Sequence, residues 1–376
     1  MQELSRRRFI GSCAAIAGAG VGVGCREPRR GNSGAGPLRY EPKGTAAVQP
    51  DFEPGYLALH RTGELRERGE DLWKWMKPCK LCPRTCGIDR LAGNLGFCDA
   101  PPHLVIASHH PHFGEERPLV GRGGSGTIFF AHCSLRCVFC INYDVSHEGR
   151  GAPREIDDLA RMMLRLQERG CHNINVVTPS HYSAHIVLAL DRAAGAGLRL
   201  PLVYNTCGWE NLEVLRKLDG IVDIYLADMK YGSGEMALRY SSLAPPDLAT
   251  LRPDVAETHS TTETYPELTQ MAVREMHRQV GVARPGADGL IYRGLMIRHL
   301  VMPNRTSGTQ EVMQWIARNL PQDTYVNLMA QYTPVYQATD FPEIARRINR
   351  AEYREAVAAA REAGLTNLDV QGAAWL

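Results

Sequence analysis

Short apolar runs alternate with longer runs of helical periodicity along the second two-thirds of the chain. Six short runs, rich in β-branched and aromatic residues, predict strands: Thr127–Phe130, Asn173–Val177, Leu202–Asn205, Ile224–Asp228, Leu295–Val301 and Thr324–Met329. Helical periodicity separates and follows these strands: Ile156–Arg169, Ala184–Ala194, Leu212–Leu218, Leu268–Gln279, Gln310–Asn319 and Glu352–Glu362. Six β-then-α units predict an α/β fold with a parallel sheet and right-handed crossovers. Periodicity alone does not separate an open barrel from a doubly wound sheet.

The same pattern divides the 376 residues into four segments. They are a signal-like stretch at 1–25, a linker at 26–55, a cysteine-rich leader at 56–120 and the α/β part at 121–376. A helix over Leu57–Trp75 is predicted to open the leader. The stretch Gly232–Thr264 is rich in Pro, Ser, Thr and Asp, and its part Leu243–Thr264 predicts a disordered loop.

The N-terminal segment has the features of a targeting signal. Ser5–Ile10 reads SRRRFI, which resembles the twin-arginine export motif, and Gly11–Gly24 is a small, apolar run of 14 residues. As a helix that run would span roughly 21 Å, less than the ~30 Å hydrocarbon core of a bilayer. It therefore predicts a signal rather than a membrane span. Cys25 is a candidate for lipidation, and the Pro/Gly/Arg-rich stretch after it predicts a linker.

Charge and composition limit the class of partner. Removing the first 30 residues changes the formal net charge from +2 to −2, because those residues hold six arginines and two glutamates. The remaining chain has no basic excess, so nothing in the charge predicts nucleic-acid binding. Membrane contact is predicted only through the signal or a lipid anchor.

Three cysteines follow the first predicted strand, in the pattern Cys133-x3-Cys137-x2-Cys140. Cysteine thiolates are the usual ligands of iron–sulfur clusters, and a cluster of four irons normally takes four of them. Three thiolates on one loop would leave one iron without a protein ligand, as catalytic metal sites keep one position open. A zinc knuckle and a disulfide loop are the alternative interpretations.

The leader contains a second, complete ligand set. Its four cysteines are Cys79, Cys82, Cys86 and Cys98, with glycines between them that permit tight turns. A second iron–sulfur cluster and a structural zinc ion both satisfy this set. In an exported protein the four could instead form two disulfides.

Polar residues stand at the predicted carboxyl ends of the strands, where the sites of barrels and open α/β sheets form. The candidates are Thr178, Ser180, Asn205, Asp228, Lys230 and Arg298. Asp228 and Lys230 are two residues apart on one strand and so share a face. Each candidate also has a structural interpretation: Ser180 could cap a helix, and Asp228 could pair with Lys230.

One glycine pattern is a false lead. Gly121, Gly123 and Gly126 match the G-x-G-x-x-G dinucleotide fingerprint, which must follow a strand and open a helix. Here the pattern precedes a strand, so it predicts a turn.

The three-cysteine loop resembles that of the radical S-adenosylmethionine superfamily, including an aromatic residue, Phe139, before the third cysteine. The resemblance implies a partial (β/α)6 barrel and a [4Fe-4S] cluster whose open iron chelates S-adenosylmethionine. It also implies a one-electron donor and cleavage to a 5′-deoxyadenosyl radical, which is chemistry that belongs to the cofactor.

A narrower resemblance is to uncharacterised proteins similar to the pyruvate formate-lyase activating enzyme. It rests on CKLCPRTCGIDR in the leader and on HNINVVTPSHY, LDGIVDIYLADMKY and IRHLVMPN further along, and it covers roughly residues 72 to 365. Where many activating enzymes have Gly-Gly-Glu to hold the amino group of S-adenosylmethionine, this chain has Thr178-Pro-Ser180. The resemblance therefore implies cofactor contacts at Phe139 and at the strand-end candidates by position only.

The predicted function is reductive cleavage of S-adenosylmethionine and hydrogen abstraction from a protein, peptide or small-molecule substrate. Activation of a glycyl-radical protein is the narrower hypothesis, and fold resemblance does not fix the substrate. The alternative is a non-catalytic iron–sulfur electron carrier or sensor. The signal-like segment favours the cell envelope, whereas dependence on S-adenosylmethionine favours the cytoplasm.

Overall fold

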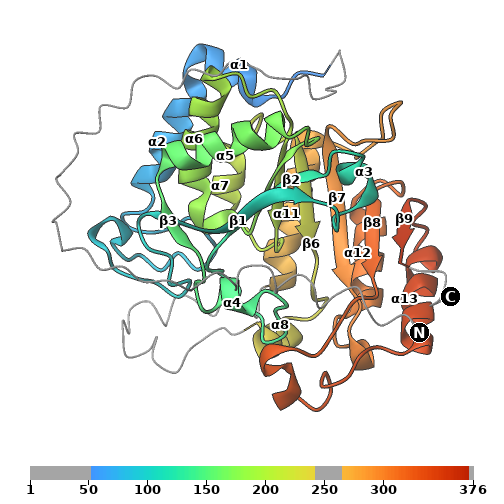
Figure 1. Cartoon of the computed structure of the whole chain (residues 1–376). Helices are drawn as coiled ribbons and strands as arrows, with labels where there is room; N and C mark the ends of the chain where they lie inside the picture. The colour runs from blue at the N-terminus through green and yellow to red at the C-terminus, as the bar shows by residue number, and fades with distance from the viewer. Residues whose placement is uncertain (1–51, 242–264, 372–376) are drawn as a thin grey trace, which may run out of the picture. The chain divides into compact units, whose positions relative to one another are not determined.

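The computed structural model describes residues 52–241 and 265–371 (Figure 1). The predicted signal, Cys25, most of the linker and the Leu243–Thr264 loop lie outside these residues. The described strands are β1 (Leu104–His112), β2 (Ser125–Phe130), β3 (Ala152–Arg154), β4 (Ile174–Val177), β5 (Leu202–Thr206), β6 (Ile224–Asp228), β7 (Gly294–Leu300), β8 (Tyr325–Met329) and β9 (Leu368–Val370).

All of these strands belong to one mixed sheet in the order β3-β1-β2-β4-β5-β6-β7-β8-β9. Strand β2 and the strands from β4 to β9 run parallel to their neighbours, whereas β1 runs antiparallel to both β2 and β3. The carboxyl ends of β2 and β4 to β9 therefore meet at one edge of the sheet. This edge receives the cysteine loop that follows β2.

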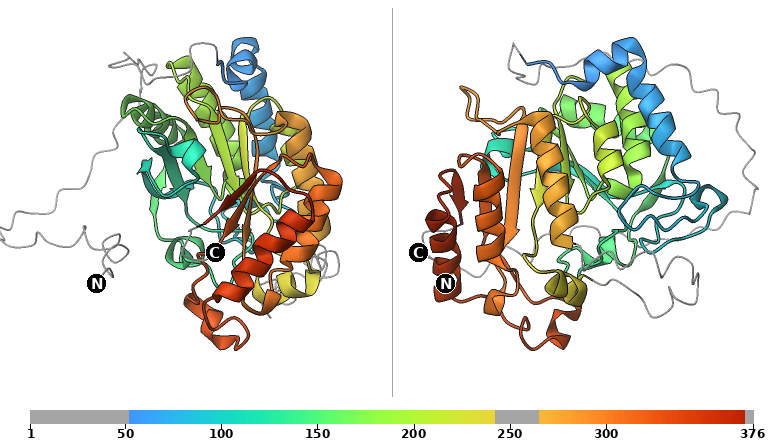
Figure 2. Two further views of the ribbon diagram at one scale, coloured as in Figure 1. Left: turned by 90° about the vertical axis from the view of Figure 1, so that its right-hand side faces the viewer. Right: turned by 180° about the vertical axis from the view of Figure 1, so that it is seen from behind.

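The helices fill the crossovers between the parallel strands. They are α1 (Tyr56–Thr62), α2 (Glu64–Lys74), α3 (Arg117–Val120), α4 (Tyr143–Ser146), α5 (Ile156–Glu168), α6 (Ser183–Gly195), α7 (Leu212–Lys217), α8 (Gly234–Tyr240), α11 (Tyr265–Val280), α12 (Thr309–Asn319) and α13 (Arg350–Glu362). Short 3-10 turns occur at η1 (Arg90–Ala92), η2 (Ser180–Tyr182), η3 (Pro303–Arg305) and η4 (Tyr336–Asp340). Helix α11 packs on β6 and β7, and α11, α12 and α13 lie side by side on one face of the sheet (Figure 2).

The other face of the sheet is divided into an apolar and a polar layer. Near the amino ends of the strands, Val203, Leu226 and Met296 belong to a buried cluster that also contains Leu119 of α3. Two residues further along the same strands stand Asn205, Asp228 and Arg298. Because side chains two apart on a strand share a face, the polar layer lies directly above the apolar one. The apolar layer closes the amino-end side, and the polar layer faces the cysteine loop.

The α/β class is confirmed, and each of the six predicted strands is present with ends within two residues of the prediction. The prediction missed β1, β3 and β9, so the described sheet has a seventh parallel strand. The predicted helix over Leu57–Trp75 is two helices, because Gly63 adopts a left-handed conformation with φ 84° that ends α1.

The glycine pattern at 121–126 is a turn, as predicted. Gly121 and Gly124 have φ values of 47° and 83°, and the chain enters β2 directly after them. Positive φ is the region that glycine tolerates best. Across residues 52–241 and 265–371, no helix has both the length and the apolar composition that crossing a membrane requires.

Candidate functional site

The three-cysteine loop leaves β2 at Phe130 and curls back over the strand ends. His132 and Arg136 adopt positive φ values of 73° and 51°, which turn the backbone around the cysteines. The His132 N–H donates to the carbonyl of Val145 at 2.9 Å, and the Cys140 N–H donates to the carbonyl of Cys137 at 3.1 Å. All three cysteines are free thiols, so the disulfide interpretation of this loop is not what the structure shows.

Each of the three sulfurs has at least one hydrogen-bond partner. The Leu135 N–H donates to Cys133 Sγ at 3.4 Å, and the Ser146 hydroxyl donates to Cys140 Sγ at 3.1 Å. Cys137 Sγ lies 3.0 Å from the hydroxyl of Ser241. Burial raises the pKa of Cys137 to about 12, and nearby Lys230 offsets part of that rise. A bound metal deprotonates a coordinating thiol outright, so the free thiol state applies to the metal-free chain.

The chemistry of the loop residues fits an iron–sulfur cluster. A cluster is held by cysteine thiolates on separate irons, and hydrogen bonds to the sulfurs tune it. Cys133, Cys137 and Cys140 provide both features, so these residues fit the group that the sequence predicts.

The leader holds its four cysteines in a set of tight turns. The Cys79 N–H donates to the Ile88 carbonyl at 2.8 Å, and the Gly87 N–H donates to the Cys79 carbonyl at 3.0 Å. Cys79, Cys82, Cys86 and Cys98 are free thiols. A hydrogen bond from Cys86 lowers the pKa of Cys79 to about 6, whereas burial raises the pKa of Cys82 and of Cys98.

Two arginines join the leader to the cysteine loop. Arg84 of the leader donates through Nε to the carbonyl of Ser134 at 2.7 Å, and its guanidinium lies 3.2 Å from the ring centre of Phe97. Arg136 of the loop donates to the carbonyl of Phe97 at 3.1 Å and pairs with Asp99 at 2.6 Å. Ser134 follows Cys133, and Phe97 precedes Cys98, so these contacts bring the first loop cysteine and the last leader cysteine close together.

Phe139 is buried beside the strand ends. Its ring centre lies 5.8 Å from that of Tyr332 and 6.4 Å from that of Tyr231. The preceding residue, Val138, donates its N–H to the carbonyl of Tyr240 at 2.8 Å. The loop is therefore held against segments that follow β6 and β8, at the predicted edge of the sheet.

Four predicted strand-end residues form one buried network. Arg298 donates to Asp228 at 2.7 Å and to the side-chain oxygen of Asn205 at 2.7 Å. Lys230 Nζ lies 2.5 Å from the second carboxylate oxygen of Asp228. Burial raises the pKa of Asp228, but the charges of Arg298 and Lys230 outweigh burial and hold that pKa below its ordinary value. The structure thus shows the ion pair, and contacts of these residues with a cofactor stay a prediction.

Thr178 and Ser180 take a different arrangement. Thr178 has φ 57°, and its N–H donates to the backbone carbonyl of Asn205 at 2.9 Å. Ser180 does not cap the helix α6, because its hydroxyl donates to the carboxylate of Glu210 at 2.5 Å. Glu210 also accepts a hydrogen bond from Thr206. Burial raises the pKa of Glu210 to about 7.

Sequence reasoning missed two further carboxylates, Glu115 and Glu116, which precede α3. Glu115 lies 3.5 Å from Arg298, and burial raises its pKa to about 7. Glu116 accepts a hydrogen bond from Asn327 at 2.9 Å, and its second oxygen has no partner among the described residues. The available signal was two adjacent acidic residues directly before Arg117-Pro118, at the start of α3.

Two buried histidines in the segment after β4 support the backbone. His181 and His185 bond through Nε2 to the carbonyls of Ala131 and Pro102, each at 2.8 Å. Burial lowers the pKa of His185 to about 3, so its ring is neutral.

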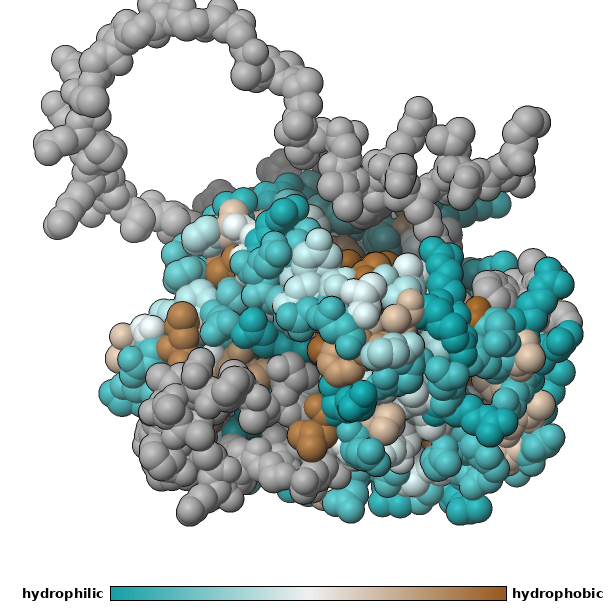
Figure 3. Space-filling model, turned by 90° about the horizontal axis from the view of Figure 1, so that it is seen from below, coloured by the Kyte–Doolittle hydropathy of each residue, from teal (hydrophilic) through white to brown (hydrophobic). Residues whose placement is uncertain are grey.

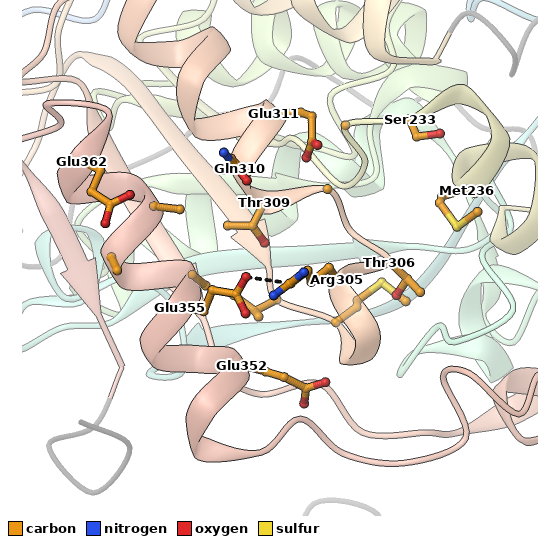
Figure 4. A pocket seen from close by; sticks show the side chains of 17 residues that line it. Ser233, Met236, Arg305, Thr306, Thr309, Gln310, Glu311, Glu352, Glu355 and Glu362 are labelled. Carbon is orange, nitrogen blue, oxygen red and sulfur yellow. Dashed lines mark ion pairs between the residues drawn. The ribbon is translucent and has the colours of Figure 1, made fainter.

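A hollow of about 370 Å³ lies away from these residues, between α12, α13 and η3 (Figure 4). Its lining includes Glu311, Glu352 and Glu355, and Arg305 pairs with Glu355 at 2.6 Å. None of the cysteines or predicted strand-end residues lines it, so it is separate from the candidate site.

The face that carries α4 and α8 is mostly hydrophilic with scattered apolar side chains (Figure 3).

Comparisons with known proteins give matches of limited reach. No family model matches the chain. An uncharacterised protein of Methanocaldococcus jannaschii is 27% identical over 297 residues, which cover 77% of this chain and 76% of that protein. The crystal structure of a radical SAM methyltransferase from Sphaerobacter thermophilus matches at 13% identity and a TM-score of 0.39, covering 86% of this chain and 94% of that one. With so low a TM-score, the second match assigns no function to this chain.

Proposed function

We propose that this protein is a radical S-adenosylmethionine enzyme with a partial (β/α)6 barrel. The observation that carries the proposal is the position of the Cys133, Cys137 and Cys140 loop. It sets three free thiols, each with a hydrogen-bond partner, at the carboxyl edge of the parallel strands. The same edge carries the buried network of Asp228 and Arg298.

The three loop cysteines would hold three irons of a [4Fe-4S] cluster and leave the fourth open. When bound and reduced, this group supplies the electron that splits S-adenosylmethionine into methionine and a 5′-deoxyadenosyl radical, which takes a hydrogen atom from the substrate. Hydrogen abstraction of this kind needs no protein base. The protein's part is therefore to bind, orient and shield.

The strand-end residues are the proposed cofactor contacts: Phe139, Thr178, Ser180, Asn205, Asp228, Lys230 and Arg298. Lys230 has an ammonium with three donors, and the structure shows one contact, to Asp228. Arg298 is already engaged by Asp228 and Asn205. Lys230 is thus better placed than Arg298 to bind the carboxylate of S-adenosylmethionine, and Arg298 holds Asp228 in position.

We further propose that the leader cysteines hold a second iron–sulfur cluster or a zinc ion. The partners are a one-electron donor and a substrate that is a protein, a peptide or a small molecule. Glycyl-radical activation is one member of this set. An electron carrier or sensor is not favoured, because a carrier needs fully ligated clusters and the loop supplies three thiols.

Anaerobic reconstitution with iron and sulfide, followed by S-adenosylmethionine and dithionite, tests the function. The wild-type protein is expected to form 5′-deoxyadenosine, and Cys140→Ser to form none. Cys171→Ser is the matched control, because Cys171 is a buried thiol outside both sets, and it should behave as wild type. If wild-type protein that carries its loop cluster forms no 5′-deoxyadenosine, the proposal is wrong.

A further inference from the structure

Cys137 stands at the end of a chain of buried hydroxyl groups. Its sulfur lies 3.0 Å from the hydroxyl oxygen of Ser241, and that oxygen lies 2.7 Å from the hydroxyl of Tyr231. Ser241 and Tyr231 are 0% and 1% exposed, so water does not compete for these hydrogen bonds. The chain of contacts is Tyr231, Ser241, Cys137.

The direction of donation follows from counting protons. A cysteine that ligates iron is a thiolate and can only accept, so the single hydroxyl proton of Ser241 must point to Cys137. The Ser241 oxygen is then free to accept from Tyr231, which donates its own proton. Donors in such a chain polarise one another.

Backbone contacts fix this arrangement. Cys137 and Ser241 form an antiparallel β-bridge, and the Val138 N–H donates to the carbonyl of Tyr240 at 2.8 Å. The hydroxyl of Ser241 therefore reaches the sulfur from a segment that is hydrogen-bonded to the cysteine loop at the preceding residue, Tyr240. A second hydroxyl, that of Ser146, donates to Cys140 at 3.1 Å from the turn after the loop.

We propose that Ser241, supported by Tyr231, and Ser146 are positioning residues that set the reduction potential of the centre held by the Cys133 loop. This inference rests on the proposed function, because it requires a cluster on those cysteines. Reduction adds negative charge to the cluster and its thiolates, and a hydroxyl donor at sulfur stabilises that charge. Hydrogen bonds to sulfur are among the terms that set such potentials. The hydroxyls make the centre easier to reduce.

The test is the midpoint potential of the reconstituted full chain, followed by electron paramagnetic resonance during a redox titration. Ser241→Ala and Ser146→Ala are each expected to shift the potential to more negative values. Tyr231→Phe should shift it in the same direction, because Tyr231 donates to Ser241 and also interacts with Cys137. Ser241→Thr keeps a hydroxyl and should restore most of the wild-type value. Ser183→Ala is the matched control, because the Ser183 hydroxyl is buried and contacts no partner among the described residues.

The outcomes separate this inference from the proposed function. Wild-type potentials in Ser241→Ala and Ser146→Ala, with iron and sulfide contents equal to those of wild type, would overturn the inference and leave the proposed function standing. If Ser241→Ala takes up no cluster, the midpoint potentials of Tyr231→Phe and Ser241→Thr provide the test. A wild-type potential in Tyr231→Phe together with a large shift in Ser241→Thr would contradict the inference. Failure of the wild-type loop to take up iron would overturn both.

Discussion

The two cysteine sets offer the same thiol ligands in different surroundings. Around the loop the donors to sulfur are a backbone N–H and two neutral hydroxyls, and one of them, Ser241, is 104 residues from its cysteine. Cations face both sets, because buried Arg84 interacts electrostatically with Cys82, Cys86 and Cys98 and also with Cys133 of the loop, and Lys230 interacts with Cys137. The loop has, in addition, hydroxyl donors at two of its sulfurs.

The pKa values of the thiols single out one leader cysteine. Burial raises the pKa of Cys137 to about 12, and it also raises the pKa of Cys82 and of Cys98 in the leader. A hydrogen bond from Cys86 lowers the pKa of Cys79 to about 6. A thiol that already ionises near neutral pH is ready to bind metal, so we expect metal uptake by the leader to depend most on Cys79.

The largest expected effect is a difference in metal content between the two cysteine sets. The double variant Cys79→Ser/Cys82→Ser should lose all metal from the leader while the loop keeps about four irons, one cluster's worth. Iron, sulfide and zinc counted per chain check this, with Cys171→Ser as the control. Loss of all iron from the double variant would show that the two sets share one centre.

The loop side depends on the buried ion pairs of Asp228 with Lys230 and Arg298. Asp228→Asn leaves Lys230 and Arg298 as buried cations without their carboxylate, and breaking such a pair typically costs about 3–5 kcal/mol. Urea unfolding of the full chain should show a loss of this size. Asp157→Asn is the control, since Asp157 forms an exposed pair with Arg192 and should lose less than ~1 kcal/mol. Equal losses in both variants would mean that the network at the strand ends is not buried.

The pH dependence of the free energy of unfolding should also arise near the cysteine loop, at Glu210. Burial raises the pKa of Glu210 to about 7, above the ~4.3 of an unfolded glutamate. The folded state therefore binds more protons between these values, and stability falls as pH rises through that window, by on the order of 3 kcal/mol. Glu210→Gln has no proton to lose and should reduce the fall in unfolding free energy between pH 5.5 and 8. The fall that remains is that of Glu115 and Asp223, because burial also raises their pKa values to about 7. A wild-type protein that gains stability over this range would contradict the assignment.

The smallest effect concerns the contact between the two sets. Arg84→Met removes the charged hydrogen bond to the Ser134 carbonyl, which is worth about 1.5–3 kcal/mol. The loss should appear in urea unfolding of the full chain, and hydrogen exchange should increase first in residues 79–99. Lys80→Met is the control, because the half-buried Lys80 makes an ion pair of 3.7 Å with Glu213 and lies over the Trp75 ring, away from the cysteine loop. Unchanged exchange in the leader of Arg84→Met would show that Arg84 does not hold it to the loop.

The strands were predictable because each is a short, buried run of branched and aromatic residues between helical segments. The rule that sites form at strand carboxyl ends correctly brought Asn205, Asp228 and Arg298 together. Strand β1 was missed because its sequence, LVIASHHPH, combines histidines with a proline. Strand β9, of three residues, is too short to show a period.

Other parts of the site have no local signal. Glu116 and Asn327 are hydrogen-bonded although they are 211 residues apart in the sequence, and Ser241 contacts Cys137 although they are 104 residues apart. Such contacts are set by how β1 and the segment after β6 cross the strand ends, which tertiary packing decides. The hydrogen bond of Ser180 to Glu210 was likewise not predicted, because a serine in that position is locally expected to cap a helix.

The central claim is that the loop cluster has one iron open to S-adenosylmethionine. Electron–nuclear double resonance on the reduced protein, with S-adenosylmethionine carrying nitrogen-15 in its amino group and carbon-13 in its carboxylate, tests it directly. The account predicts hyperfine coupling from both labels to the cluster, present in Cys79→Ser/Cys82→Ser and absent in Cys140→Ser. A loop cluster at full iron content that shows no coupling to either label would contradict it.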